Sequence, residues 1–153
     1  MIVRPVSEAD RPAWAAMRHL LWVDFDPAEL DAELADLEAS GIPYVTLVAE
    51  AEDGRLVGFA EVGVRSVAEG CPPGPAGYLE GIWVEPGWRR RGVARALLEA
   101  AEQWARERGL GHFGSDALLD NEASIAPPAS RKRSGWSPSA RAGITGKVAT
   151  SEK

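Results

Sequence analysis

The most distinctive chemistry of this sequence lies in one glycine-rich corner. An apolar run ends and a run with helical spacing begins within Val84-Glu85-Pro86-Gly87-Trp88-Arg89-Arg90-Arg91-Gly92-Val93-Ala94. The first amides of a helix have no partners within the helix and lie at the positive end of its dipole. Because Gly92 and Ala94 lack bulk, an anion can approach this backbone closely. The corner predicts a pyrophosphate cradle, and an exposed arginine-rich helix start is the plainer alternative.

Two other phosphate-binding patterns do not fit this corner. A Walker A loop requires a Gly-Lys-Ser/Thr run, which does not follow here. The corner also differs from the Gly-x-Gly-x-x-Gly turn after the first strand of a doubly wound sheet.

The elements around the corner predict an α+β fold with one sheet, in the order β-α-α-β-β-β-α-β. Apolar runs bounded by turn signals such as Asp53-Gly54 indicate strands over 2–6, 44–50, 56–64, 77–84 and 112–117. Apolar residues at three- and four-residue spacing indicate helices over 8–21, 26–40 and 91–108. The expected buried stripe of the third helix is Val93, Ala94, Leu97, Leu98, Ala101 and Trp104, and that of the second is Leu30, Leu34 and Leu37.

The composition limits the class of protein. The chain has 153 residues, a formal net charge of −6 and one cysteine. One cysteine cannot form an internal disulfide framework or a cysteine-rich zinc site, so a cytoplasmic protein without a metal centre is expected. No run approaches the roughly 18 apolar residues of a membrane span. The acidic balance argues against nucleic acid and favours a small cationic partner.

The charge divides the chain into two unequal parts. Residues 1–121 hold 11 Arg, no Lys and 21 Asp and Glu, whereas residues 122–153 hold six Lys and Arg and two Glu. The only Leu, Ile, Val or Phe residues of the second part are Ile125, Ile144 and Val148, too few to build a core. We expect one folded domain over 1–121 and an aberrant, disordered tail over 122–153.

Several motifs together resemble a known family. Arg89-x-x-Gly92-x-Ala94 after a strand and a proline looks like the acetyl-CoA signature of the GCN5-related N-acetyltransferases. The match narrows to the aminoglycoside 6'-N-acetyltransferases over about residues 2–124. The motifs that carry it are Leu21-Trp22, Leu79-Glu80-Gly81-Ile82, Gln103-Trp104, and Ser115-Asp116 followed by Asn121.

The resemblance implies a fold, a reaction and a cofactor site. The fold is a mixed, mainly antiparallel sheet flanked by helices. The reaction is direct attack of an aminoglycoside 6'-amine on the thioester of acetyl-CoA, which confers antibiotic resistance. The implied cofactor contacts are the backbone of Ile82, Trp83 and Val84 for the pantetheine arm, the amides of Arg90, Arg91, Gly92, Val93, Ala94 and Arg95 for the pyrophosphate, and Asn121 from the other side.

Two carboxylates and two aromatic residues complete the expected site. Such a reaction needs a carboxylate that holds and deprotonates an ammonium group. Asp116 is the first choice for the base and Glu80 for substrate anchoring, with the roles exchangeable. Trp22 and Phe25 follow the first helix, where the family has substrate contacts. The plainer alternatives are solvated strand-end acids, a core Trp and a loop aromatic.

After Asn121 the sequence departs from the family. Relatives continue with Ser-His-Arg, a helix, Ala-Leu-Gly-Phe and a last strand, whereas this chain reads Ser124-Ile125-Ala126-Pro127-Pro128, which disfavours a helix. One back-translation, with a single C restored after Ser124, reads HRTARIAKALGLVAER in the shifted frame. We therefore hypothesise a frameshift that removes the C-terminal helix and strand. Their loss puts the homodimer of the family in doubt.

Three readings of the function compete. The first is an aminoglycoside 6'-N-acetyltransferase, impaired in this chain. The second is an N-acetyltransferase for another amine, such as a polyamine or a peptide N-terminus. The third is an inactive, truncated product. The acidic pair with Trp22 favours the first over the second, and the tail favours the third.

Overall fold

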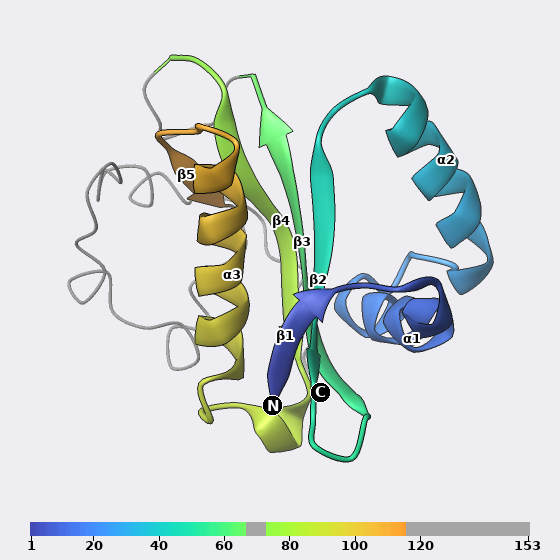
Figure 1. Cartoon of the computed structure of the whole chain (residues 1–153). Helices are drawn as coiled ribbons and strands as arrows, with labels where there is room; N and C mark the ends of the chain where they lie inside the picture. The colour runs from blue at the N-terminus through green and yellow to red at the C-terminus, as the bar shows by residue number, and fades with distance from the viewer. Residues whose placement is uncertain (67–72, 116–153) are drawn as a thin grey trace.

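The computed structural model describes residues 1–66 and 73–115, which form one five-stranded sheet with helices on both faces (Figure 1). The strands are β1 (Ile2–Pro5), β2 (Tyr44–Glu50), β3 (Leu56–Arg65), β4 (Ala76–Val84) and β5 (Phe113–Ser115). The helices are α1 (Arg11–Leu21), α2 (Leu30–Ser40) and α3 (Val93–Glu107). The expected α+β class and element order are confirmed. The predictions beyond Ser115, including the tail, lie outside the described residues.

The sheet is mixed and mainly antiparallel. Its strands lie in the order β1-β2-β3-β4-β5, and only β4 and β5 are parallel. That parallel pairing spans three residues of each strand, Gly77–Leu79 and Phe113–Ser115. Since α3 connects these two strands, the chain crosses one face of the sheet between them.

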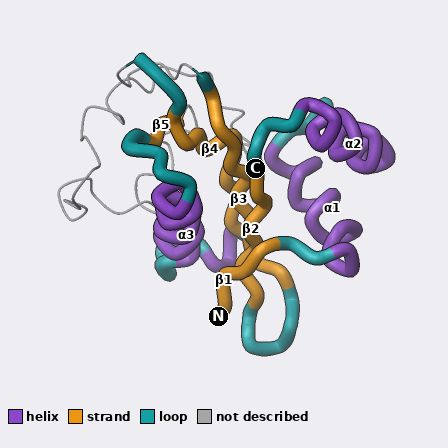
Figure 2. The backbone as a smooth tube through the Cα atoms, turned by 45° about the horizontal axis from the view of Figure 1, so that its top comes forward, coloured by secondary structure: helices purple, strands orange, loops and turns teal. Residues whose placement is uncertain are grey.

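Two apolar cores lie on opposite faces of the sheet. On one face α3 packs Leu97 against Val57, and both are fully buried. On the other face α1 packs Trp14 against Phe59 and Trp83. Figure 2 shows the sheet between α3 on one side and α1 and α2 on the other. This two-sided burial explains why β4 reads as an almost continuous apolar run.

The boundaries of α3 differ slightly from the sequence prediction. The helix begins at Val93 rather than Arg91, because Gly92 adopts a left-handed conformation at φ 83°. Gly109, at φ 73°, follows its end as predicted. Ala105 is fully buried, whereas Trp104 is only partly buried. The buried stripe therefore continues through Ala105.

Helix α2 stands away from the sheet as an outer wall (Figure 1). Of its predicted apolar stripe only Leu30 is buried, while Leu34 and Leu37 are partly exposed. Gly41 ends the helix in a left-handed conformation at φ 70°, as the sequence predicts. The space between α2 and the sheet is the cleft described below.

Candidate active site

The corner after β4 has the backbone shape of an anion-binding turn. A 3₁₀ turn, Pro86–Trp88, leads through residues 89–92 into α3. Arg90 and Gly92 are both left-handed, with φ of 61° and 83°. Such turns create concave arrays of backbone N–H groups. The Ala96 N–H donates to the Gly92 carbonyl at 3.0 Å, so the amides before it precede the helical hydrogen bonds.

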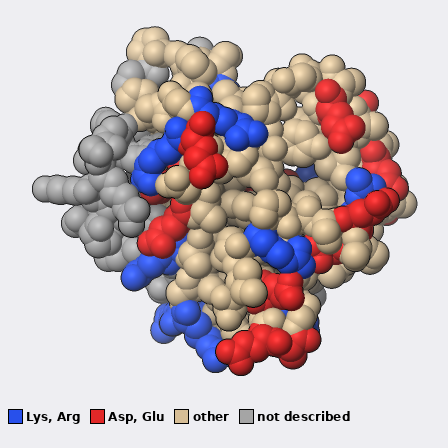
Figure 3. All heavy atoms as spheres, viewed as in Figure 1, with Lys and Arg blue, Asp and Glu red and all other residues tan. Residues whose placement is uncertain are grey.

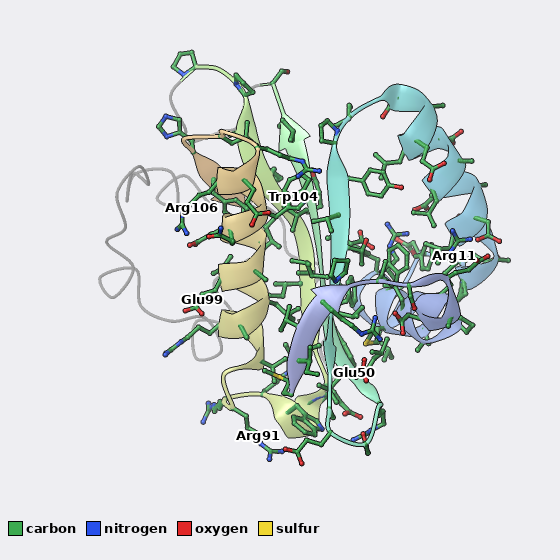
Figure 4. All side chains as sticks on the ribbon, viewed as in Figure 1. Arg11, Glu50, Arg91, Glu99, Trp104 and Arg106 are labelled. Atoms are coloured by element: carbon green, nitrogen blue, oxygen red, sulfur yellow. The ribbon has the colours of Figure 1, made fainter. Side chains whose placement is uncertain are left out.

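The side chains of this corner leave the backbone open to solvent. A Cβ atom added to Gly92 would meet nothing within 4 Å. The side chains of Val93 and Ala94 are buried against the sheet, whereas those of Arg90, Arg91 and Arg95 are exposed. Figure 4 labels Arg91 at this corner, beyond the N-terminal end of α3. Open amides with basic side chains around them fit a phosphate group.

β4 has a free edge next to this corner. Its pairing with β5 covers only Gly77–Leu79, so residues 80–84 pair with a strand on one side only within the described part of the chain. A Cβ atom added to Gly58 of β3 would lie 2.8 Å from the Trp83 carbonyl oxygen, so this carbonyl faces β3. Since backbone groups alternate sides along a strand, Ile82 and Val84 direct theirs to the other edge, where Arg89 Nε donates to the Val84 carbonyl at 2.9 Å. A cofactor arm could align there.

A bulge in β4 sets the direction of Glu80. Glu61 of β3 pairs with Gly81, and the following residue of β3 pairs with Leu79. Glu80 is therefore an extra residue in β4. Leu79 and Ile82 consequently both lie in the core beneath α3, whereas Glu80 lines the cleft on the opposite face.

The cleft lies between α1, α2 and the sheet and has a volume of about 920 Å³. Three of the predicted substrate residues line it together: Trp22, Phe25 and Glu80. The charged residues of its lining are Asp24, Glu29, Glu33, Asp36, Glu61 and Glu80 against Arg18 and Arg65. Acidic side chains also gather over the outer surface of α2 (Figure 3). The excess of carboxylates suits a cationic ligand.

Glu80 is paired with an arginine in this structure. Arg65 donates from Nε at 3.0 Å and from Nη2 at 2.7 Å to the two carboxylate oxygens of Glu80. The Arg65 guanidinium also lies over the Tyr78 ring, 3.7 Å from its centroid. Both side chains of the ion pair remain about 40% exposed, at 43% and 40%. Solvent access keeps such a pair weak and exchangeable.

Trp22 and Phe25 contribute to the cleft in different ways. Trp22 is partly buried and meets Phe59 edge to face, with 6.3 Å between ring centroids. Phe25 is 8% exposed and belongs to the core beneath α1. His19 forms a 2.7 Å hydrogen bond with the Phe25 carbonyl and so holds this loop. Trp22 therefore offers a partly open ring, and Phe25 mainly shapes the floor.

The sequence did not predict a partly buried ion pair in the lining of the cleft. Arg18 of α1 donates from Nε and Nη2 to the two carboxylate oxygens of Glu61, and Trp14 Nε1 donates to the same carboxylate at 3.1 Å. Two signals could have found it. Glu61 is the only charged residue between 56 and 64, and Arg18 lies one helical turn from both Trp14 and Trp22.

Burial and hydrogen bonding act against each other in this pair. Burial lowers the pKa of the Arg18 guanidinium, but hydrogen bonds to Glu61 and Glu33 outweigh it and raise the pKa further above its ordinary value. Burial raises the pKa of the Glu61 carboxyl, and hydrogen bonds from Arg18 and Trp14 oppose this shift. The guanidinium is thus the permanent charge of the pair.

Two predicted site residues, Asp116 and Asn121, lie outside the described residues. Within residues 1–66 and 73–115, no helix is long and apolar enough to cross a membrane. The same residues hold no group of three or more His, Cys, Asp or Glu side chains arranged to bind a metal ion.

Known proteins with similar sequences carry the name of one activity. An aminoglycoside N(6')-acetyltransferase type 1 from Klebsiella aerogenes is 44% identical over 127 residues, which cover 82% of this chain and 84% of that protein. Another protein of that name, from Stenotrophomonas maltophilia, is 40% identical over 122 residues, covering 78% and 76%.

Solved structures show the same fold. An aminoglycoside antibiotic 6'-N-acetyltransferase from Acinetobacter haemolyticus superposes with a TM-score of 0.69 at 35% identity, covering 81% of this chain and 84% of its own. The enzyme AAC(6')-Iy, solved with a bisubstrate analogue of CoA and monomethyl-acetylneamine, gives 0.67 at 32% identity, covering 80% and 83%. A sequence model of the acetyltransferase (GNAT) family matches residues 14–126. The chain therefore belongs to the GNAT acetyltransferase family.

Proposed function

We propose that this protein transfers an acetyl group from acetyl-CoA to the 6'-amino group of an aminoglycoside antibiotic and so confers resistance. The observation that carries the proposal is the position of Glu80. The bulge in β4 directs its carboxylate into an acidic cleft, beside the free edge and the anion-binding corner of the same strand. Relatives at 44% and 40% identity carry the name of this activity.

The cofactor would lie along β4 and the start of α3. The outward backbone groups of Ile82 and the N–H of Val84 would pair with the pantetheine arm, with Trp83 between them, while the Val84 carbonyl accepts from Arg89. The amides of Arg90, Arg91, Gly92, Val93, Ala94 and Arg95 would hold the pyrophosphate, and Asn121 would contact the cofactor from the other side. The open Gly92 backbone supports this arrangement. Bound acetyl-CoA supplies the thioester that the amine attacks.

The cleft would hold the antibiotic through its positive charges. Glu80 would anchor the reacting ammonium group, exchanging it for the exposed Arg65 guanidinium. Trp22 and Phe25 would form the apolar wall beneath a sugar ring. Asp116 is the proposed base, with Glu80 as the alternative, because the attacking nitrogen must lose a proton before or during attack.

One assay separates this function from its nearest rivals. Thiol release from acetyl-CoA is measured with kanamycin, spermine and a peptide N-terminus as acceptors. The proposal expects release with kanamycin and little with the other two. Release with spermine or the peptide alone would indicate an acetyltransferase of another amine.

We also propose that residues 1–121 form the acetyltransferase domain and that residues 122–153 are an aberrant tail, frame-shifted after Ser124. The family match ends at residue 126, close to residue 124, where the resemblance to the family ends. The nucleotide sequence decides the origin of the tail, because a one-base shift must restore the family's His-Arg and Ala-Leu-Gly motif, as it does in HRTARIAKALGLVAER. The absence of thiol release with every acceptor would identify the chain as an inactive product.

We infer a cytoplasmic location from the single cysteine. We also propose that this chain can form the homodimer of the family. The helix and strand that often complete that dimer would be replaced by the tail in this chain, which weighs against a dimer. Sedimentation of the full chain with and without acetyl-CoA tests it.

A further inference from the structure

One partly buried cation, Arg18, joins three walls of the cleft. Arg18 lies on α1 with its side chain 15% exposed, and it binds Glu61 of β3 at the floor. Its Nη1 donates to Glu33 of α2, the outer wall, at 2.5 Å. The guanidinium carbon lies 5.1 Å from the Trp22 centroid and 4.6 Å from that of Phe25. A guanidinium can serve such a site because its planar fork binds carboxylates while its faces stack on rings.

Two of the residues that Arg18 contacts, Glu61 and Trp22, lie against β4 at its bulge. Glu61 is the residue that pairs with Gly81, directly after the extra residue Glu80. Trp22 covers Gly81 so closely that an added Cβ atom would lie 2.5 Å from Cη2 and Cζ2 of the indole. Arg18 therefore contacts both the strand partner of Gly81 and the ring that covers it.

We propose that Arg18 is a positioning residue, which holds Glu61 and Trp22 against Gly81 and thereby directs Glu80 into the cleft. The inference rests on the proposed role of Glu80 as the anchor of the substrate ammonium. Arg18 itself binds no substrate in this scheme. Without Arg18, the Trp22 indole and the backbone at Gly81 are no longer held in place. The Glu80 carboxylate then adopts several orientations, and the affinity for the substrate falls.

The ordinary alternative is an ion pair that only stabilises the fold. α1 offers a matched control for this alternative, because Arg11 also bridges α1 to α2, through Asp31 at 3.2 Å. That pair is exposed, at 43% and 81%, and takes no part in the cleft lining. Figure 4 shows Arg11 on the α2 side of α1.

The experiment compares full-length Arg18→Gln, Arg18→Lys and Arg11→Gln with the parent chain. The KM for kanamycin should rise about tenfold or more in both Arg18 variants, while the KM for acetyl-CoA changes by less than about twofold. Lysine keeps the positive charge but lacks the planar guanidinium that binds a carboxylate through two N–H groups, so Arg18→Lys should not restore the KM of the parent chain. Arg11→Gln should leave both constants unchanged. Equal losses for both substrates, or full rescue by lysine, would overturn the proposal.

A second readout does not depend on turnover. The backbone amide resonances of Glu80 and Gly81, and the indole N–H of Trp22, should shift or broaden in the Arg18 variants and stay in place in Arg11→Gln. Unchanged resonances would refute the inference even if the chain proves inactive, whereas absent turnover in the parent chain would count only against the proposed function. Should Arg18→Gln not fold, Glu61→Gln removes the same contact and is scored by the same resonances.

Discussion

At the scale of single residues, the Glu80 carboxylate suits an anchoring role because its ion pair with Arg65 orients it but can be displaced by another cation. The Arg65 pair orients the carboxylate, yet both side chains keep about 40% of their exposure. Exposed ion pairs contribute about 0–1 kcal/mol, so a substrate ammonium in an acidic cleft can replace the guanidinium. The Arg18–Glu61 pair is less exposed, at 15% and 13%, and should exchange less readily.

The substitution Glu80→Gln tests this anchor directly. Glutamine keeps the size but loses the charge, and hydrogen bonds to charged groups contribute about 1.5–3 kcal/mol. We expect kcat/KM for kanamycin to fall about tenfold to a hundredfold, with the KM for acetyl-CoA unchanged. Steady-state kinetics with each substrate varied measures this. Glu38→Gln on α2, outside the cleft lining, is the control, and an equal loss there would argue against a specific anchor.

Two glycines of the same conformation separate backbone strain from cofactor binding. Gly92 and Gly54 have φ of 83° and 87°, and a Cβ on either would meet nothing within 4 Å. Alanine at each should therefore destabilise the fold by about 1–2 kcal/mol. Only Gly92→Ala should raise the KM for acetyl-CoA several-fold, because its methyl group stands in the proposed cradle. Similar KM values in the two variants would remove Gly92 from the cofactor site.

Those parts of the candidate site that depend on residue type and on the position of strand ends could be predicted from the sequence. The glycine-rich turn, Trp22 and Glu80 were identified by their motifs. The bulge was not predicted. β4 is apolar almost throughout, so an extra residue interrupts no alternation of polar and apolar residues, and only the register of β3 with β4 reveals it. Arg18 and Glu61 were missed because each charge finds its partner 43 residues away in the chain.

At the scale of elements, the helices and strands follow local signals closely. Strand β2 has the predicted bounds, Tyr44–Glu50, because a proline before it and a turn after it limit the run. Helix α2 shows what local signals cannot predict. Its leucine stripe predicts an apolar face packed against the core, but this face forms the wall of a cleft, because the stripe does not determine which other element packs against it.

The junction between β1 and α1 depends on one carboxylate. Asp10 accepts hydrogen bonds from Arg4 at 2.7 Å and 3.0 Å, and from the N–H and hydroxyl of Ser7. The Arg4 hydrogen bonds, with those from Ser7, hold the pKa of Asp10 well below its usual range although burial opposes them. A carboxyl with a lowered pKa stabilises the fold above its unfolded-state pKa of about 3.9 and loses that contribution as the pH falls towards its folded-state pKa.

Asp10→Asn should consequently destabilise the protein in a pH-dependent way. We expect a loss of about 1–2 kcal/mol at pH 7, and the difference from the parent chain should shrink as the pH falls below about 4. Urea unfolding at a series of pH values measures it. Asp31→Asn, whose carboxylate is 81% exposed, should have almost no effect. A constant difference across all pH values would show that the hydrogen-bond geometry, rather than the charge, matters.

At the scale of the whole molecule, the charge is distributed according to the proposed chemistry. The part over 1–121 carries a net charge of −10, and its carboxylates include six in the lining of the cleft. The arginines at residues 89–91 and 95 instead gather at the corner that would hold a phosphate. The molecule thus has an acidic cleft beside the middle of β4 and a basic corner after the end of the same strand. In the proposed reaction, the amine would lie in the cleft and acetyl-CoA at the corner.

The composition of the tail gives the last test at this scale. Residues 122–153 contain three Leu, Ile, Val or Phe residues and two adjacent prolines, whereas the shifted frame supplies an apolar, helix-forming run, HRTARIAKALGLVAER. Restoring one C after Ser124 should therefore add buried apolar surface and stability, and raise kcat/KM for kanamycin. Thermal unfolding and thiol release measure both effects. A chain ending at Ser124 is the control, and the frameshift hypothesis expects it to match the parent chain. If the restored chain is no more stable and no more active than that control, the frameshift hypothesis is wrong.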